Sequence, residues 1–401
     1  MLQSKIPNLT IGLIATLGFI AILGPFGSDA YLPALPIMAK DLHTNITGVQ
    51  GVLAAFTVGM AFGQLLMGSI SDALGRRRLI ILGPLVMAAS SFIGGFAQNL
   101  VILLLSCALI GFSASTGMVV GRALISDLVT GLSAARAFSL MGLFVGVGPI
   151  TGPLAGALVL QAANWRWVFF FLSILALAVA TVAIVLVPES LAKEKRQPLR
   201  LGSMFAAGKE IMRNKLFLQH AVILWCTATI MFAYISSSPF ITQQILDFTP
   251  LEYTYVFGIN GVGLMIAGAI SSAAAKRVSP RRIVSWGVSM QLIAAGVLLA
   301  TWIMGTPSVW NILPALFLMV SAMGFLFGPA TALGLTQVRH HAGTAMALQG
   351  SIQFLICGVS ATLVGLAGPD EFWPLALIVS ICSVVSLGFW IASKRTLADA
   401  L

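Results

Sequence analysis

The chain has 401 residues, of which 58% are hydrophobic and only 8% are charged. Soluble domains carry about a quarter charged residues, so this composition excludes a soluble globular protein and indicates an integral membrane protein. The net charge of +10 does not indicate a nucleic-acid-binding protein, because the basic residues form short clusters between apolar segments rather than one continuous basic face. The four cysteines lie in apolar runs without CxxC spacing, which predicts neither a zinc site nor a disulfide framework.

Apolar runs long enough to cross a bilayer, about 20 residues each, recur along the whole chain. The longest polar segment separates a first set of six runs from a second set. We therefore predict an all-α membrane protein with an N-terminal six-helix bundle over residues 1–188, a connector over 189–215 and a C-terminal six-helix bundle over 216–401. The predicted spans cover residues 9–36, 47–71, 79–98, 100–125, 137–161, 167–187, 216–238, 253–275, 283–304, 309–335, 343–367 and 372–393.

The basic residues are distributed asymmetrically between the two sides of the predicted membrane. With the N-terminus inside, the inner segments hold nearly all of the 22 lysines and arginines, whereas Lys40 and Arg166 fall outside and Arg122 lies near the inner end of the fourth span. Positively charged loops stay in the cytoplasm. The pattern therefore predicts that both termini and the connector are cytoplasmic.

One short stretch between the second and third predicted spans concentrates this charge. Residues 68–78 read GSISDALGRRR, with an acid at Asp72, a glycine at Gly75 and three arginines. Glycine readily adopts positive φ, so the pattern predicts a very tight turn on the cytoplasmic side. The same frame recurs weakly about half a chain later, at residues 276–282, where the acid and the glycine are absent. A repeat of half the chain length indicates two similar halves.

This stretch resembles the loop between helices 2 and 3 of the major facilitator superfamily, whose signature is Gly-x-x-x-Asp-x-x-Gly-Arg-Arg/Lys. The signature is matched in order and spacing by Gly68, Asp72, Gly75, Arg76 and Arg77. The alternative is a basic loop in an unrelated helical membrane protein. The resemblance implies twelve transmembrane helices in two pseudo-symmetric bundles, with a central cavity that opens alternately to each side.

A single acidic residue, Asp29, lies within the body of a predicted span. A carboxylate inside the membrane is costly unless it faces a cavity or a partner, which makes such residues candidates for ion and proton pathways. Gly24, Pro25 and Gly27 loosen the same helix, as a site that admits water and moves would require. The alternative is an acid at the interface that outside water solvates.

The sequence around Asp29 narrows the resemblance. The pattern Asp-x-Tyr-Leu-Pro-x-x-Pro, which includes Tyr31, is similar to the first span of the bicyclomycin-resistance (Bcr/CflA) branch of drug/proton antiporters. Segments at residues 165–169 and 238–240 agree with that branch. The resemblance implies a protein of the bacterial inner membrane in which Asp29 takes part in proton or substrate coupling.

Residues 146–156 of the fifth span combine glycines at four-residue spacing with two prolines. Such glycines let a facing helix approach closely, and the prolines free backbone carbonyls and bend the helix. A plain packing face would use the glycines but has less reason for the prolines. The segment resembles the antiporter motif of drug exporters, and the matching residues are Gly148, Pro149, Gly152, Pro153 and Gly156.

One position departs from the pattern of the family. The family usually places an arginine in the fourth span, in Arg-x-x-Gln-Gly, and the aligned residue here is Cys107. Arg122 lies about four turns further along, where we expect its side chain to reach the membrane interface. A functional substitute for the missing arginine is the alternative. The departure puts the family's charge arrangement around Asp29 in doubt.

The turn at residues 68–78 also predicts a gate. Helix N-termini present unpaired N–H groups that attract carboxylates, and the eleventh span begins with the small residues Gly343 and Thr344, which would let the second span approach. Pseudo-symmetry places these spans side by side. We predict that Asp72 lies against this N-terminus and that Arg76 or Arg77 bridges Asp72 and Asp127, in a latch that is intact only when the cavity faces outside. The predicted cytoplasmic latch consists of Asp72, Gly75, Arg76, Arg77, Asp127, Gly343 and Thr344.

No nucleotide-binding loop, G-x-S-x-G elbow or metal-spaced histidine cluster occurs, so neither an enzyme nor an ATP-driven pump is predicted, and we expect no metal and no cofactor. The proton gradient is the expected energy source. The expected partners are a small-molecule substrate, protons and the lipid bilayer, and we expect a monomer that binds no nucleic acid. The candidates for the cavity wall are Tyr31, Phe232, Tyr234, Phe325, Phe327, Gln349 and Gln353.

The predicted function is proton-coupled export of small amphipathic compounds or drugs by alternating access. A dedicated exporter or importer of one metabolite, of the amino acid or siderophore type, would share every motif named above and is one alternative. A non-transporting membrane sensor on the same fold is the other, and binding without flux would reveal it.

Overall fold

The computed structural model describes residues 11–129, 131–196, 208–338, 342–365 and 371–398. Every regular element in these ranges is helical. Twelve stretches within them are long and apolar enough to cross a membrane. The prediction of an all-α membrane fold is confirmed.

The first six spans differ from the predicted ones mainly at their ends. The first span continues to Asp41 and is interrupted after Asp29, because Pro33 lacks the N–H that would extend the helix. The third span begins at Arg76, since Gly75 alone forms the turn before it. The elements are α1 (Ile11–Asp29), the 3-10 turn η1 (Leu32–Ala34), α2 (Leu35–Asp41), α3 (Ile46–Leu74), α4 (Arg76–Gly95), α5 (Leu100–Leu128), α6 (Gly131–Ala162) and α7 (Arg166–Leu186).

The second set of spans contains two irregular helices. The seventh span ends in a π-helical turn, η3 (Ile241–Ile245), and the tenth consists of two helices, because a turn at Phe325 and Leu326 follows Gly324. The elements are η2 (Lys193–Lys195) in the connector, α9 (Lys215–Phe240), η3, α10 (Pro250–Ala274), α11 (Pro280–Met304), α12 (Val309–Gly324), α13 (Phe327–Leu335), α14 (Ala342–Val364) and α15 (Trp373–Ala398).

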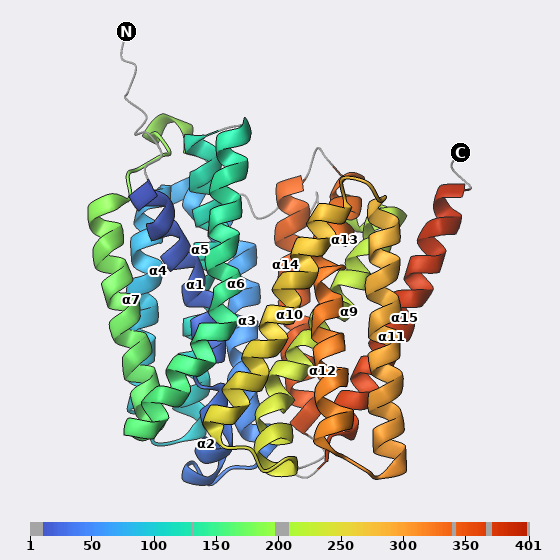
Figure 1. Ribbon diagram of the computed structural model, residues 1–401. Helices are drawn as coiled ribbons and strands as arrows, with labels where there is room; N and C mark the ends of the chain where they lie inside the picture. Colours follow the sequence, from blue (N-terminus) through green and yellow to red (C-terminus); the bar gives the residue numbers. More distant parts are fainter. Residues whose placement is uncertain (1–10, 130, 197–207, 339–341, 366–370, 399–401) are drawn as a thin grey trace. The chain divides into compact units, whose positions relative to one another are not determined.

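The contacts of the chain divide it into two compact units. Unit 1 takes residues up to 34 together with 55–201, and unit 2 takes residues 35–54 together with those from 202 onwards. In unit 1, α4 lies beside α5 and α7, and α1 lies beside α5 and α6 (Figure 1). In unit 2, α9 lies beside α14 and α15, and α12 beside α10 and α11. The helix α3 therefore belongs to unit 2 by its first turns and to unit 1 by the rest.

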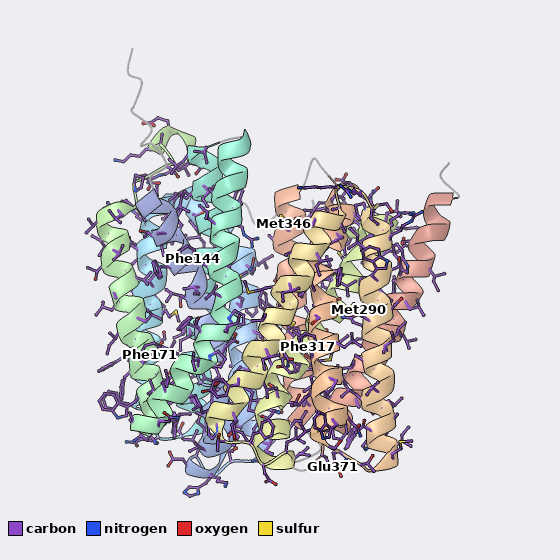
Figure 2. All side chains as sticks on the ribbon, viewed as in Figure 1. Phe144, Phe171, Met290, Phe317, Met346 and Glu371 are labelled. Carbon is purple, nitrogen blue, oxygen red and sulfur yellow. The ribbon has the colours of Figure 1, made fainter. Side chains whose placement is uncertain are left out.

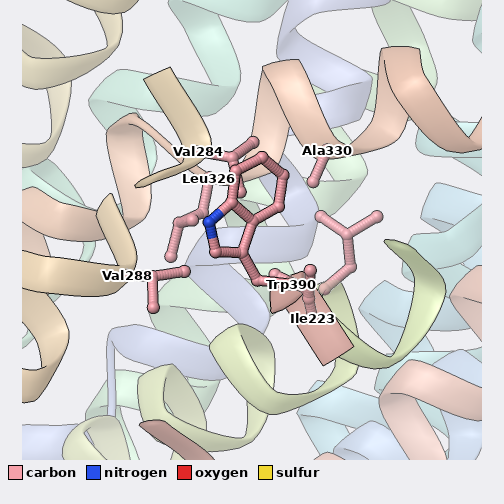
Figure 3. Packing of buried hydrophobic residues seen from close by; sticks show 7 residues of the cluster. Ile223, Val284, Val288, Leu326, Ala330 and Trp390 are labelled. Atoms are coloured by element: carbon pink, nitrogen blue, oxygen red, sulfur yellow. The ribbon is translucent and has the colours of Figure 1, made fainter. Parts of the chain in front are cut away.

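Each unit is held by close packing of apolar side chains. In unit 1, the ring of Phe144, labelled on α6 in Figure 2, fills the space that the missing side chain of Gly18 leaves on α1. In unit 2, Trp390 of α15 packs against Val284 and Val288 of α11 and Ile223 of α9 (Figure 3). Lipid tails are as apolar as these side chains, so packing rather than exclusion of water stabilises the contacts.

Candidate functional site

Asp29 is the last residue of α1, at the interruption of the first span. The residue is 2% exposed, and the Ser28 hydroxyl donates a hydrogen bond of 2.6 Å to its Oδ1 atom. Within the ranges that the structure describes, no basic side chain forms an ion pair with Asp29. A carboxylate removed from water without a cation beside it is costly, and uptake of a proton removes that cost. The arrangement suits a group that alternates between a protonated and a charged form.

Tyr31 lies in the turn that interrupts the first span and attaches this turn to α7. The residue is fully buried, and its ring stacks on that of Phe169, with centroids 5.5 Å apart and planes at 7°. Phe169 in turn meets Trp165 edge-on. Among the residues that the structure describes, the Tyr31 hydroxyl finds no hydrogen-bond partner, although buried phenols usually have one. A buried hydroxyl without a partner in the described ranges thus lies two residues beyond Asp29.

The glycines of the fifth span face this part of α1. A Cβ atom on Gly152 would lie 3.5 Å from the Cβ of Asp29. A Cβ on Gly156 would overlap the carbonyl oxygen of Ala30, and one on Gly148 would lie 2.6 Å from Pro25. The spacing of four residues thus places three glycines on one face of α6, and α1 packs directly on that face. The glycines that resemble an antiporter motif and the acid of the first span, which the sequence analysis treated separately, therefore lie together.

The two prolines of the motif lie inside α6. Pro149 is half-buried and Pro153 is buried. Neither residue has a backbone N–H, so each leaves a carbonyl one turn earlier without its helical partner. The helix that packs on Asp29 is therefore weakened at the level of the acid.

Cys107, where the family usually has an arginine, is fully buried in α5. The surroundings are close-packed, since a Cβ on Gly111 of the same helix would overlap the Phe56 carbonyl of α3. Arg122 lies further along α5 and is exposed. Arg122 makes no ion pair among the described residues, and its place at the membrane interface stays a prediction.

Gly75 forms the turn between α3 and α4. Its φ of 98° lies where side chains other than glycine are strained. A Cβ at this position would also overlap the carboxylate of Glu189 and lie 2.7 Å from the guanidinium of Arg196. Both the backbone and the surroundings require a glycine here, which accounts for the tight turn expected from the sequence.

Arg76 connects two carboxylates next to this turn. Its NH1 atom lies 2.6 Å from Oδ1 of Asp72, and its Nε atom lies 3.1 Å from Oδ2 of Asp127. The hydroxyl of Ser71 also contacts NH1. The side chain of Arg76 is 11% exposed, whereas that of Asp72 is 48% exposed. Of the two arginines considered for this bridge, Arg76 is the one that forms it, and it joins α3, α4 and α5 within unit 1.

Arg77 binds a different helix. Its Nε and NH2 groups donate hydrogen bonds of 2.8 Å each to the carbonyl oxygens of Val187 and Ile184. The last carbonyls of a helix lack intrahelical partners and carry partial negative charge. Arg77 therefore caps the end of α7 and attaches it to the start of α4.

The connector contributes residues that sequence reasoning missed. Glu189 accepts a hydrogen bond of 2.9 Å from the backbone N–H of Arg76, and its other oxygen lies 3.4 Å from Arg196. The hydroxyl of Ser190 donates a hydrogen bond of 2.9 Å to Asp127. A carboxylate at a helix N-terminus is stabilised by the helix dipole. The signal in the sequence was an acid, Glu189, directly after the sixth span. The basic turn that this acid contacts lies 113 positions earlier in the chain.

Two aromatic cavity candidates of unit 2 lie in packed pairs. The ring of Tyr234 stacks on that of Phe257, with centroids 5.5 Å apart, and its hydroxyl accepts a hydrogen bond of 2.8 Å from Asn260. Phe232 meets Phe354 edge-on at 5.8 Å. Both candidates are buried. Asn260, which the sequence did not single out, orients the Tyr234 hydroxyl.

The other candidates of unit 2 are dispersed. Phe325 packs edge-on against Trp286, and Phe327 packs against the cluster of Figure 3. Gln349 and Gln353 are half-buried on α14. Their assignment to a cavity wall stays a prediction.

Two residues of the predicted latch belong to unit 2. Gly343 and Thr344 lie in the first turn of α14, the former exposed and the latter half-buried. Their predicted contact with Asp72 would join the two units, and it stays a prediction.

The chain matches the family described as Major Facilitator Superfamily over residues 17–361. It is 30% identical over 398 residues to the uncharacterized MFS-type transporter YdgK of Bacillus subtilis, with 98% of each chain covered. It is 26% identical over 392 residues to the bicyclomycin resistance protein homolog of Haemophilus influenzae, with 96% of each chain covered. The second relative carries the name of the branch that the first-span pattern resembles.

A solved structure shows the same fold. A bacterial homolog of the human lysosomal transporter Spinster, in an inward-facing and unoccupied conformation, matches 96% of this chain and 97% of its own, with a TM-score of 0.74 at 16% identity. At this identity the likeness concerns the fold alone. The twelve spans, the glycine turn and the match over residues 17–361 agree, and the chain belongs to the Major Facilitator Superfamily, a family of membrane transporters rather than enzymes.

Proposed function

We propose that this transporter is a proton-coupled antiporter that exports small amphipathic compounds, drugs among them, by alternating access. The observation that carries the proposal is the state of Asp29, which is 2% exposed and has no ion-pair partner among the described residues. The name of the relative in Haemophilus influenzae supports drug export as the class of activity.

The surroundings of Asp29 support coupling between a proton and a helix movement. The acid ends α1 and packs against Gly152 of α6. Pro25 lies inside α1, and α6 contains two prolines, so both helices are weakened near the acid. A bend in either helix would change whether water reaches the carboxylate, and thereby favour binding of the proton on one side and its release on the other.

In the proposed cycle the protein lies in the bacterial inner membrane as a monomer, with both termini in the cytoplasm. The turn at Gly75 then faces the cytoplasm, because its three arginines follow the positive-inside rule. Closure of this face would bring Asp72 to the first turn of α14, where a helix-end contact contributes about 0.3–2 kcal/mol. Such a contact biases the equilibrium between two conformations without locking it.

The test begins with a growth screen of an overexpressing, efflux-deficient strain against a panel of compounds. For each compound that the chain exports, substrate-induced proton release is measured in everted vesicles. We expect Asp29→Asn to abolish proton release, because an amide has the same shape but does not take up a proton. The control is Glu371→Gln, which changes an exposed acid outside the spans. An Asp29→Asn variant with normal proton coupling would contradict the proposal. If the chain protects the cells against one compound alone, the proposed export of drugs would give way to the alternative, a dedicated transporter of one metabolite.

A further inference from the structure

The first turns of α3 are attached to α9 and α14 by two side chains. The hydroxyl of Thr47 donates a hydrogen bond of 2.7 Å to the carbonyl oxygen of Gly365. The amide of Gln50, which is 1% exposed, donates a bond of 3.1 Å to the carbonyl oxygen of Ser236. All four residues belong to unit 2. No charged group takes part in either bond.

Gly365 fits this contact because it has no side chain. A Cβ atom on Gly365 would overlap Oε1 of Gln50 and lie 2.8 Å from the Cα of Thr47. The backbone of Gly365 thus lies directly against α3, one residue beyond the end of α14. Even an alanine at this position would push α3 away or displace Gln50.

The surface that receives α3 is itself joined by hydrogen bonds. The hydroxyl of Ser236 on α9 donates a bond of 3.0 Å to the carbonyl of Ala361 on α14, and the hydroxyl of Ser360 on α14 donates one of 3.3 Å to the carbonyl of Thr229 on α9. The ends of α9 and α14 therefore form one surface, and α3 docks on it as a separate element.

The end of α9 that receives Gln50 is irregular. Pro239 lies inside the helix and removes the N–H that would pair with the carbonyl of Ile235, and the hydroxyl of Ser238 donates a bond of 3.4 Å to that carbonyl instead. The π-helical turn η3 follows directly. Turns of this kind are frequent at functional sites. This end of α9 can rewind without breaking a regular helix.

The rest of α3 is attached to a different unit. Beyond the first turns, the helix packs on α5 so closely that a Cβ on Gly59 would overlap the carbonyl of Ala108. A Cβ on Gly63 would lie 2.7 Å from the carbonyl of Phe112. Close backbone contact thus occurs at both ends of α3, and in unit 2 it is accompanied by the two hydrogen bonds of Thr47 and Gln50. The attachment in unit 2 therefore differs from the one in unit 1 in that single side-chain substitutions can remove its hydrogen bonds.

We propose that Thr47, Gln50, Ser236 and Gly365 form an outer clasp, which holds the membrane face opposite the Gly75 turn closed and must open in each transport cycle. The inference rests on the proposed alternating access. Thr47 and Asp72 lie at opposite ends of α3, about 38 Å apart at a rise of 1.5 Å per residue, so they lie near opposite faces of the membrane. Opening of the outer face frees the first turns of α3 from α9 and α14.

The experiment measures how often the clasp opens. In a cysteine-free background, Leu53→Cys places a reporter thiol on α3 at a fully buried position one turn beyond Gln50. A membrane-impermeant methanethiosulfonate reagent is added outside intact cells, and the rate of modification is recorded. We expect Thr47→Val and Gly365→Ala each to raise this rate by about fivefold, the effect of one net hydrogen bond on an equilibrium.

Two matched controls address general loosening of the helices. Thr331→Val removes a hydroxyl that bonds within its own helix, and Gly388→Ala adds a methyl group that no neighbouring helix of the described chain approaches within 4 Å. We expect both to change the rate by less than about twofold. Thr47→Val keeps the shape of the side chain, so its effect is readable even if Gly365→Ala does not fold. The double variant should be about as fast as the faster single variant, because both changes affect one contact.

The result also separates the clasp from the proposed proton coupling. Unchanged modification in Thr47→Val, with normal export, overturns the clasp and leaves the antiporter intact. Faster modification in both clasp variants, combined with normal proton coupling in Asp29→Asn, supports the clasp and overturns the role of Asp29. Equal acceleration in the clasp variants and in the controls overturns the clasp.

Discussion

Two turns rich in lysine and arginine, one at Gly75 and one at residues 275–279, are built in different ways. In unit 1, Gly75 alone separates α3 from α4, and the neighbouring Arg76 is bound by two acids. In unit 2, residues 275–279 separate α10 from α11, and Ser279 precedes α11 with a φ of −61° and without a side-chain cap. No ion pair is found in the described chain for the basic residues of the second turn, which are Lys276, Arg277, Arg281 and Arg282.

The comparison shows that basic residues at a membrane can have two roles, to orient a turn and to fix its geometry. Positive charge alone is enough to keep a turn in the cytoplasm, and both turns have it. A fixed geometry additionally needs acids that hold the arginine and a glycine that lets two helices approach. The second turn lacks both, so we expect it to determine orientation only. The first turn is also a junction of four helices and the connector.

The largest effect is expected from the loss of the central cation. Arg76→Gln leaves Asp72 and Asp127 without their shared partner, whereas Arg281→Gln at the second turn breaks no ion pair that the described residues form. Removal of one partner from a buried pair costs about 3–5 kcal/mol, and less here because Asp72 is 48% exposed. We expect export in vesicles to fall by at least about tenfold, or about 1.4 kcal/mol, in Arg76→Gln alone. Equal losses in the two variants would show that the turns are equivalent.

A smaller effect is expected from the turn residue itself. Gly75→Ala places a side chain at a φ of 98° and against Glu189, and strain of this kind costs about 1–2 kcal/mol. Ser279→Ala changes a residue with ordinary backbone angles and should stay within about 0.5 kcal/mol. Thermal unfolding of the two purified variants in detergent measures the contrast. A stable Gly75→Ala variant would mean that the turn can adopt another path.

The smallest effect is expected at the connector. Glu189→Gln keeps a hydrogen-bond acceptor for the N–H of Arg76 but removes the charge at the start of α4, which is worth about 0.3–1 kcal/mol. The matched control is Glu194→Gln, an exposed connector acid. Unfolding at low and high salt measures the difference, which should shrink as salt screens the charge. A difference that does not depend on salt would assign Glu189 a role other than a charged cap.

Local features of the sequence predicted the parts of the molecule that depend on local chemistry. The spans follow from runs of apolar residues, and the turn follows from the order of Asp72, Gly75 and Arg76. The interruption after Asp29 has a local cause as well, in Pro33, although the first span was predicted as one continuous helix. A single proline near the end of an apolar run does not distinguish a helix end from a kink.

The remaining features depend on residues that are far apart in the chain. Glu189 and the N–H of Arg76 are separated by 113 positions, and Thr47 and Gly365 by 318. No periodicity links such residues, because they meet only when the helices have packed. The same holds for the contact between Asp29 and Gly152, since each belongs to a pattern that is complete within its own span.

Because α3 belongs to both units, the number of residues between its two contacts is constrained. Gln50 docks in unit 2 and Gly59 in unit 1, on one continuous helix. One residue added between them would rotate one end against the other by about 100° and move it by about 1.5 Å, so only one of the two faces would still fit. The number of residues between Gln50 and Gly59 therefore sets the distance and the angle between the two contacts of α3. For most positions in this segment, we expect the number of residues to matter more than the identity of their side chains.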